Sequence, residues 1–195
     1  MIDLLALSQQ CAPNVAPSTL QAIIRTESGF NPLALHVNGP VRLQRPPKSA
    51  AEAAAWSSWL IGRGYSVDMG LMQINSRNLT RLNLTSAEAF EPCQNVRAGA
   101  AILTAEYGQA AQTHGIGTQA LLHAISAYNT GNFEGGFHNG YVLRVMMHAS
   151  SARSLSAPAQ LPTHCSSRSA NAGHCAHSSQ PYTVDSAVRG FDRQP

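Results

Sequence analysis

The chain has 195 residues, of which 12% are charged, and a formal net charge of +3. This length suits one domain with a sizeable core. So small a positive charge, without a Lys/Arg cluster, argues against nucleic-acid binding, and no run approaches the ~20 apolar residues of a membrane span. Residues 2–7 are too short an apolar run for a signal peptide, so export would require a longer precursor or another route.

The first predicted helix spans residues 18–28 and contains the most informative residue of the chain, Glu27. Ser18 and Gln21 have the spacing of a capping box. The apolar positions follow i, i+3, i+4 spacing and are Leu20, Ile23 and Ile24. Glu27 comes next on that stripe, and a carboxylate on an apolar face is unfavourable unless it is paired or protonated. The alternative is a solvated carboxylate in the last helical turn, which is the common state of glutamate.

The chain beyond this helix predicts further helices and little strand. Residues 32–47 are typical of a turn or small hairpin, in which Val41 and Leu43 alternate with polar residues. Capping boxes, glycine stops and apolar stripes predict helices over 50–61, 68–75, 95–107, 118–128 and 141–148. The predicted fold class is therefore mostly α, with at most a small β-hairpin.

The composition changes after residue 150 and divides the chain into a helical domain, 1–150, and a tail, 151–195. Nine of the 45 tail residues are Ser and four are Pro, whereas Leu, Val and Phe together number five. Because so little apolar surface cannot offset the chain entropy, the tail is expected to be disordered. Cys165 and Cys175 lie beside histidines, but their spacing matches no standard zinc site.

Glu27 differs from the other acids of the helical domain because it has no evident structural role. The other seven fall at the terminus, in capping boxes, in turns or on a polar helix face: Asp3, Glu52, Asp68, Glu88, Glu91, Glu106 and Glu134. Asp68 precedes Gly70 and is expected to cap the next turn, although it is also the one further acid that could assist chemistry. A single acid indicates general acid–base work without a second enzymic nucleophile.

Three short motifs carry a resemblance to a known family. They are Glu27–Pro32 (ESGFNP), Gly70–Asn75 (GLMQIN) and Ala127–Asn132 (AYNTGN). In this order they resemble the motifs of lytic transglycosylases in the goose-type lysozyme and soluble lytic transglycosylase (SLT) superfamily, over roughly residues 10–148. The resemblance implies a two-lobed, lysozyme-like helical domain.

A narrower resemblance is to the transglycosylase subunits of type IV secretion systems, with related proteins in type III systems. It rests on the segments QQCAP at 9–13, PCQN at 92–95 and NGYV at 139–142. An even number of cysteines permits either a Cys11–Cys93 disulfide or two buried free thiols. The resemblance favours the disulfide.

The resemblance also implies a mechanism and a set of site residues. Glu27 would protonate the glycosidic oxygen between N-acetylmuramic acid (MurNAc) and N-acetylglucosamine (GlcNAc), with a pKa raised by its apolar surroundings. The substrate N-acetyl oxygen would attack C1, and Glu27 would then deprotonate the C6 hydroxyl to close a 1,6-anhydro ring. The implied substrate-binding residues are Ser28, Gly70, Leu71, Met72, Gln73, Asn75, Tyr128, Asn129 and Tyr141. No metal or cofactor is expected.

Individual roles follow from the same resemblance. Ser28 would bind the N-acetyl region, Tyr128 would orient Glu27 or the sugar, and Tyr141 would form a groove wall. Gln73 and the main chain near Leu71 and Met72 would line a groove between a helical lobe and a lobe containing residues 33–69. The alternative for Tyr128 is an ordinary core position, and the alternative for Ser28 is a polar residue at the end of its helix. The side chains of Leu71 and Met72 are themselves expected to lie in the core.

The sequence thus predicts an exported, periplasmic enzyme that opens peptidoglycan locally for a type IV secretion apparatus. Its expected partners are glycan strands and periplasmic subunits of that apparatus, without nucleic acid or an integral membrane segment. Two alternatives remain. A hydrolytic lysozyme on the same fold would need a water-positioning acid, for which Asp68 is the nearest candidate in sequence, and a wall-binding scaffold would need no chemistry.

Overall fold

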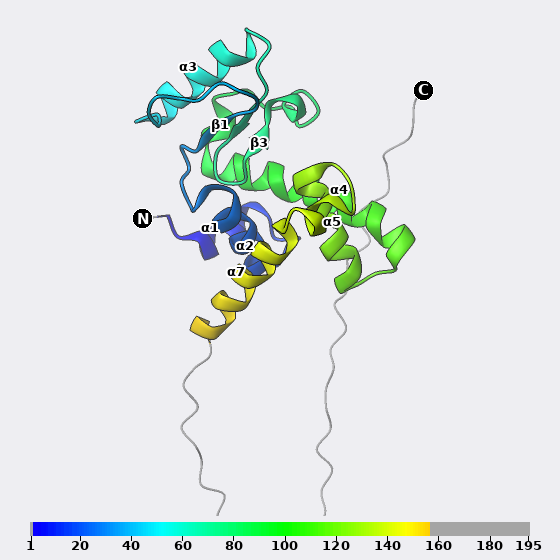
Figure 1. Cartoon of the computed structure of the whole chain (residues 1–195). Coiled ribbons are helices and arrows are strands. Elements are labelled where there is room, and N and C mark those ends of the chain that lie inside the picture. The colour runs from blue at the N-terminus through cyan, green and yellow to red at the C-terminus, as the bar shows by residue number, and fades with distance from the viewer. Residues whose placement is uncertain (1, 157–195) are drawn as a thin grey trace, which may run out of the picture. The chain divides into compact units, whose positions relative to one another are not determined.

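The structure, a computed structural model, describes residues 2–156, with side chains to residue 150. This part of the chain is mostly helical and contains a small antiparallel sheet (Figure 1), as the sequence predicts. The α-helices are α1 (Leu4–Cys11), α2 (Pro17–Ser28), α3 (Ala50–Ile61), α4 (Pro92–His114), α5 (Thr118–Thr130), α6 (Gly135–His138) and α7 (Tyr141–Ser156). The strands are β1 (Leu35–Val37), β2 (Val67–Met69) and β3 (Ile74–Asn75), and the 3-10 helices are η1 (Ser76–Asn78) and η2 (Glu88–Phe90).

The larger of two hydrophobic cores lies among the helices α1, α2, α4, α5 and α7. Helix α4 packs against α5, and α2 packs against α7. The apolar stripe of α2 is completely buried in this core, at Leu20, Ile23 and Ile24. The stripe predicted from the sequence therefore faces inward, and it fixes the direction in which the last turn of α2 presents Glu27.

Helix α2 differs from the prediction at its N-terminal end and agrees with it at its C-terminal end. The predicted capping box does not form, because the helix begins at Pro17 with Ala16 at the N-cap and no side-chain cap. Proline is favourable at the first helical position, where its missing N–H has no partner to lose. Gly29 ends the helix in the left-handed conformation, with φ of 58°, as expected from a glycine stop.

The smaller core lies between the sheet, α3 and η2. Its buried residues are Val37, Ala53, Leu60, Val67, Met69, Ala89 and Phe90. Helix α3 begins as predicted, with the Ser49 hydroxyl accepting a hydrogen bond from the Glu52 N–H. Helix α4 contacts η2 and β3 on this side and α1 and α5 on the other, so it connects the two cores (Figure 1).

The sheet comes from segments other than those predicted. The predicted helix over 68–75 is wrong: these residues form β2, a tight turn and β3, in the strand order β1-β2-β3. Gly70 makes the turn with φ of 75°, a conformation that favours glycine. Val41 and Leu43 form no strand, and β1 pairs instead with the distant β2.

An additional helix and the bounds of two others also differ from the prediction. Helix α1, capped by the Asp3 carboxylate, was not predicted. Helix α4 begins at Pro92, so Asn95 lies inside it rather than at its cap. Helix α7 continues to Ser156, whereas the rest of the predicted tail, residues 157–195, lies outside the described residues together with both of its cysteines. None of the helices described is long and apolar enough to cross a membrane.

Candidate active site

A cleft of about 1160 Å³ lies between the two cores and is the place where the predicted site residues meet. Its walls come from α2, α4 and α5 of the helical core and from residues of the sheet region. Six of the predicted residues line it: Glu27, Ser28, Gln73, Asn75, Tyr128 and Asn129. The three sequence motifs therefore converge on one cleft, although they are far apart in the chain.

Glu27 opens into this cleft from the last turn of α2, next to the apolar stripe that this helix buries in the larger core. Burial raises the pKa of its carboxyl group from 4.5 to about 7. A hydrogen bond from Tyr141 and the positive charge of Arg144 lower this pKa, while the negative charge of Asp68 raises it. A carboxyl group with a pKa near 7 can give up a proton and take one back at neutral pH.

The hydrogen-bond partner of Glu27 is Tyr141 rather than the predicted Tyr128. The Tyr141 hydroxyl, from the first residue of α7, donates to Glu27 Oε1. Tyr141 is 2% exposed and does not line the cleft, so its predicted place as a groove wall is wrong. Tyr128 lines the cleft, and its hydroxyl donates to the main-chain carbonyl of Met72, at 2.7 Å. Burial and the nearby Glu27 charge raise the pKa values of both tyrosines, so both stay protonated.

The middle of the second motif lies behind the cleft wall. The side chains of Leu71 and Met72 are completely buried in the helical core, as predicted. Their main chain and Gly70 do not line the cleft, which corrects the place predicted for them. The main chain of this segment instead supports the wall, because the Met72 and Gly70 carbonyls accept hydrogen bonds from Tyr128 and Gln73 side chains. The side-chain amide of Gln73 also donates to the Ala34 carbonyl, at 3.2 Å.

The side chain of Asn95, a residue of α4, holds the main chain of the second motif in place by hydrogen bonds. The sequence did not indicate this role. The Asn95 side chain is 1% exposed and accepts a hydrogen bond from the Met72 N–H at 2.7 Å. It donates to the carbonyls of Met69 at 2.8 Å and Ala89 at 2.6 Å. A Cβ atom on Gly70 would lie 2.3 Å from the Asn95 amide nitrogen, so both the conformation and the space at this position require glycine.

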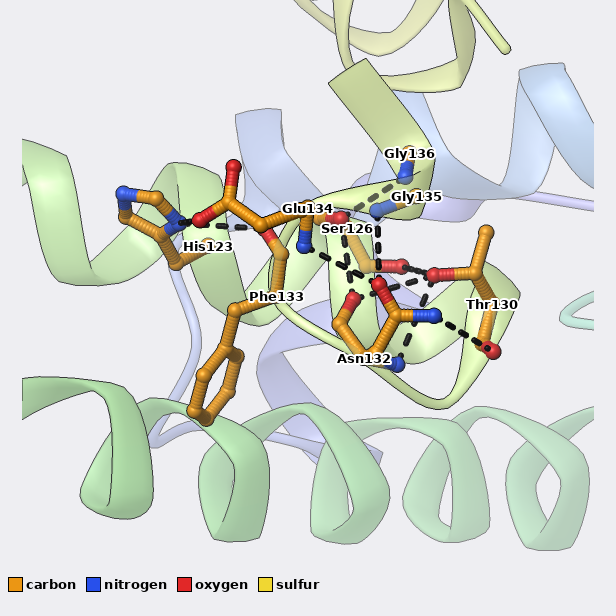
Figure 2. Close-up of polar contacts among 8 residues, drawn as sticks. All are labelled: His123, Ser126, Thr130, Asn132, Phe133, Glu134, Gly135 and Gly136. Carbon is orange, nitrogen blue, oxygen red and sulfur yellow. Dashed lines mark hydrogen bonds and ion pairs between the residues drawn. The ribbon is translucent and has the colours of Figure 1, made fainter. Parts of the chain in front are cut away.

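The third motif is held by a polar loop that follows α5. Gly131 ends α5 in the left-handed conformation, and the next residue, Asn132, accepts hydrogen bonds from the N–H groups of Glu134 and Gly135 (Figure 2). The Ser126 hydroxyl donates to the Asn132 carbonyl at 3.0 Å and accepts from the Gly136 N–H at 2.8 Å. This loop keeps the end of α5, with Tyr128 and Asn129, in place at the cleft.

Asp68 also lines the cleft, on the sheet side, and does not cap the turn as predicted. It lies in the middle of β2, where its neighbours Val67 and Met69 point into the smaller core. Its carboxylate accepts hydrogen bonds from Asn38 and Asn75. The apolar–polar–apolar pattern of Val67, Asp68 and Met69 is the signal that predicts a strand with one outward side chain.

Two smaller predictions have structural outcomes. Ser28 lines the cleft, and its hydroxyl donates to the Ile24 carbonyl of its own helix, at 3.1 Å. Cys11 and Cys93 form a disulfide between α1 and α4, with 5.4 Å between their Cα atoms. The disulfide that the family resemblance favoured is therefore present.

The chain is similar in sequence to a known family and to individual known proteins. The chain matches the family model described as the Transglycosylase SLT domain over residues 5–142. It is 42% identical over 155 residues to the type IV secretion system protein virB1 of Brucella abortus, which covers 76% of this chain and 65% of that protein. It is 44% identical over 140 residues to the protein virB1 of Agrobacterium fabrum, covering 71% and 56% respectively. The chain thus spans less than two thirds of the length of these relatives. No solved structure matches it.

Proposed function

The chain belongs to the Transglycosylase SLT domain family, and from this premise we propose that it is a lytic transglycosylase of peptidoglycan. The proposal rests above all on Glu27, a carboxyl group with a pKa of about 7 that opens into a large cleft. Burial makes this group an acid at neutral pH, and Tyr141 keeps one of its oxygens fixed. The family resemblance inferred from the three motifs is confirmed at the level of the family.

In the proposed reaction, Glu27 acts first as an acid and then as a base. Its proton passes to the glycosidic oxygen between MurNAc and GlcNAc while the bond from C1 to that oxygen breaks. The N-acetyl carbonyl oxygen of the muramyl residue forms a bond to C1. The Glu27 carboxylate then removes the proton of the C6 hydroxyl, whose oxygen bonds to C1 as the N-acetyl oxygen leaves. The product is a 1,6-anhydromuramyl end, and no water is consumed.

Product analysis with intact murein tests this proposal. We expect the wild-type protein to release 1,6-anhydromuramyl products, identified by mass spectrometry. The Glu27→Gln variant keeps the size of the side chain and loses the proton, so its rate should fall by about 10²-fold or more. Glu91→Gln is the matched control, because Glu91 is exposed and lies outside the cleft. Full activity of Glu27→Gln would refute the proposed mechanism.

A hydrolytic reaction is the second candidate, and the position of Asp68 in the same cleft favours it. A second carboxylate facing the substrate could position a water molecule for attack at C1. Hydrolysis would give products that end in a reducing sugar, so the same mass spectra separate the two reactions. A wild-type protein that binds murein without cleaving it would instead be a wall-binding scaffold.

We also propose that the enzyme works in the periplasm and opens the cell wall for a type IV secretion system. The names of its relatives and the family of its domain support this proposal. Its expected partners are glycan strands and the periplasmic subunits of the apparatus. In the bacterium that encodes it, replacing the wild-type gene by the Glu27→Gln allele should lower secretion or conjugation. Unchanged transfer with an equal periplasmic amount of the variant would argue against this role.

A further inference from the structure

Both tryptophans of the chain lie on helix α3, outside the cleft that contains Glu27. They are Trp56 and Trp59, three residues apart on this helix. Trp56 is half-buried, whereas Trp59 is 55% exposed. Neither is among the residues that form the smaller core or pack against it. Because exposing two large aromatic side chains side by side is unfavourable in water, such a surface marks a place where a ligand or partner binds.

The two rings line a second hollow of about 550 Å³, which we call the tryptophan hollow. Its other residues on α3 are Ala55 and Leu60, and the rest of its lining is the segment 43–45. The lining is largely apolar, with a few polar groups. A concave surface of this size and composition is typical of a site for a small molecule or for one unit of a polymer.

An arginine lies over each of the two rings. Cζ of Arg45 is 4.7 Å from the ring centre of Trp56, and Cζ of Arg63 is 3.7 Å from that of Trp59. The attraction between a guanidinium group and an aromatic face helps to fix the position of each ring. Arg63 does not line the tryptophan hollow, so it supports Trp59 without closing the hollow. Rings that are oriented in advance lose less entropy when a ligand binds.

Arg45 brings hydrogen-bond donors to the tryptophan hollow, and its charge is already paired. Its guanidinium group donates to the two oxygens of Glu52, at 2.6 and 3.2 Å, and to the Pro46 carbonyl at 3.2 Å. These bonds to described residues use three of its five N–H donors, which leaves two for a ligand. Gln44 also lines the hollow and carries a side-chain amide. Aromatic rings beside such donors suit an uncharged polar ligand with apolar faces.

The tryptophan hollow adjoins the cleft, because the same three residues line both: Leu43, Gln44 and Arg45. A ligand that is long enough to cross this segment therefore reaches from one to the other. A glycan strand of peptidoglycan is such a ligand, since its saccharides continue on both sides of the bond that is cleaved. The C–H face of a pyranose ring stacks on an aromatic ring, while its hydroxyl and N-acetyl oxygens accept hydrogen bonds from N–H donors.

We propose that the tryptophan hollow is an outer binding site for the glycan strand, which holds saccharides beyond those in the cleft. This inference rests on the proposed action on peptidoglycan and adds a second site to it. A saccharide ring stacks on Trp59, and the N–H groups of Arg45 and Gln44 donate to its oxygens. No bond is formed or broken there. Two linked contacts on one strand keep the enzyme on its substrate longer than the cleft alone.

Tryptophan fluorescence reports directly on this site, because the chain has no tryptophan elsewhere. The titration uses the Glu27→Gln variant, to prevent cleavage, and peptide-free glycan strands that an amidase has released from murein. We expect the strands to change the fluorescence. By calorimetry, adding Trp59→Ala to this variant should raise the Kd for the strands about 10-fold. Ile116→Ala is the matched control, since Ile116 is 83% exposed and lines neither the cleft nor the tryptophan hollow.

The same substitutions are then tested for cleavage in protein that retains Glu27. Trp59→Ala should raise KM for murein about 10-fold, with a much smaller effect on kcat, because the site acts in binding and not in the reaction. Thermal unfolding verifies that each variant is folded. Since Trp59 is exposed, its loss should leave the fold intact.

The possible contrary results are distinguishable. If the strands leave the fluorescence unchanged, or if folded Trp59→Ala binds them as tightly as Ile116→Ala, the inference is wrong and the proposed function stands. If Trp59→Ala lowers secretion in the bacterium without weakening strand binding, the surface binds a protein and the inference is again wrong. If the wild type releases no 1,6-anhydromuramyl products, the proposed function is wrong, whatever the tryptophans bind.

Discussion

Replacing Glu27 by Gln should make the protein more stable at alkaline pH, even though it removes the proposed activity. The folded protein raises the pKa of Glu27 from 4.5 to about 7, chiefly through burial. Between these two pH values the folded state binds more protons than the unfolded state, so stability falls as pH rises. With about 1.4 kcal/mol for each pH unit, the loss amounts to about 3 kcal/mol by pH 8. Glutamine is spared this loss because it never ionises.

The assay is urea unfolding of wild type and Glu27→Gln at pH 4.5 and pH 8. The Gln side chain keeps an oxygen that can accept the hydrogen bond from Tyr141, so the two proteins should have similar stability at pH 4.5. At pH 8 the variant should be more stable by about 3 kcal/mol. The refuting result is a stability difference between the two proteins that does not change with pH. In that case Glu27 would have an ordinary pKa, and the reasoning for its role as an acid would fail.

Two further predictions concern Tyr141 and the disulfide. Tyr141→Phe removes the hydrogen bond that stabilises the Glu27 carboxylate, so the pKa of Glu27 should rise and the alkaline limb of the pH–rate profile should move to higher pH. A limb that stays in place or moves to lower pH contradicts the hydrogen bond. The double variant Cys11→Ser, Cys93→Ser opens a loop with a sequence separation of 82 and should destabilise the protein by about 4 kcal/mol. Its melting temperature should fall by roughly 10 °C, and wild type under strong reductant should fall equally; an unchanged melting temperature would contradict the disulfide.

The parts of the fold that the sequence predicted are those in which the signal is local. The stripe of α2 and its glycine stop, the Ser49 cap of α3 and the end of α5 at Gly131 all depend on residues within one or two helical turns. The sheet depends on segments that are distant in sequence, since the whole of α3 lies between β1 and its partner β2 along the chain. A short segment such as 68–75 satisfies both a helical and a strand pattern, and only its partners decide between them.

The second motif illustrates why a motif identifies a site more reliably than it identifies contacts. The sequence predicts that the main chain of Leu71 and Met72 lines the groove, yet it lies behind the cleft wall, where the Met72 carbonyl accepts a hydrogen bond from Tyr128. The residue that holds this main chain, Asn95, lies on another helix. A buried amide with three main-chain partners is costly to lose, but its sequence context is that of an ordinary helical polar residue.

The reassignment of Asp68 changes the reasoning about mechanism more than any other difference. In the sequence, Glu27 appeared to be the one acid without a structural role because Asp68 was assigned to a cap. The structure removes that assignment, since Asp68 is a strand residue whose carboxylate faces the cleft. Setting aside every acid whose local sequence suggests a structural role therefore identified Glu27, the group with the raised pKa. It also set aside Asp68, which lies in the same cleft. A raised carboxyl pKa needs burial, which the apolar stripe of a helix records in its sequence, whereas the amide donors of Asp68 come together only in the folded sheet region.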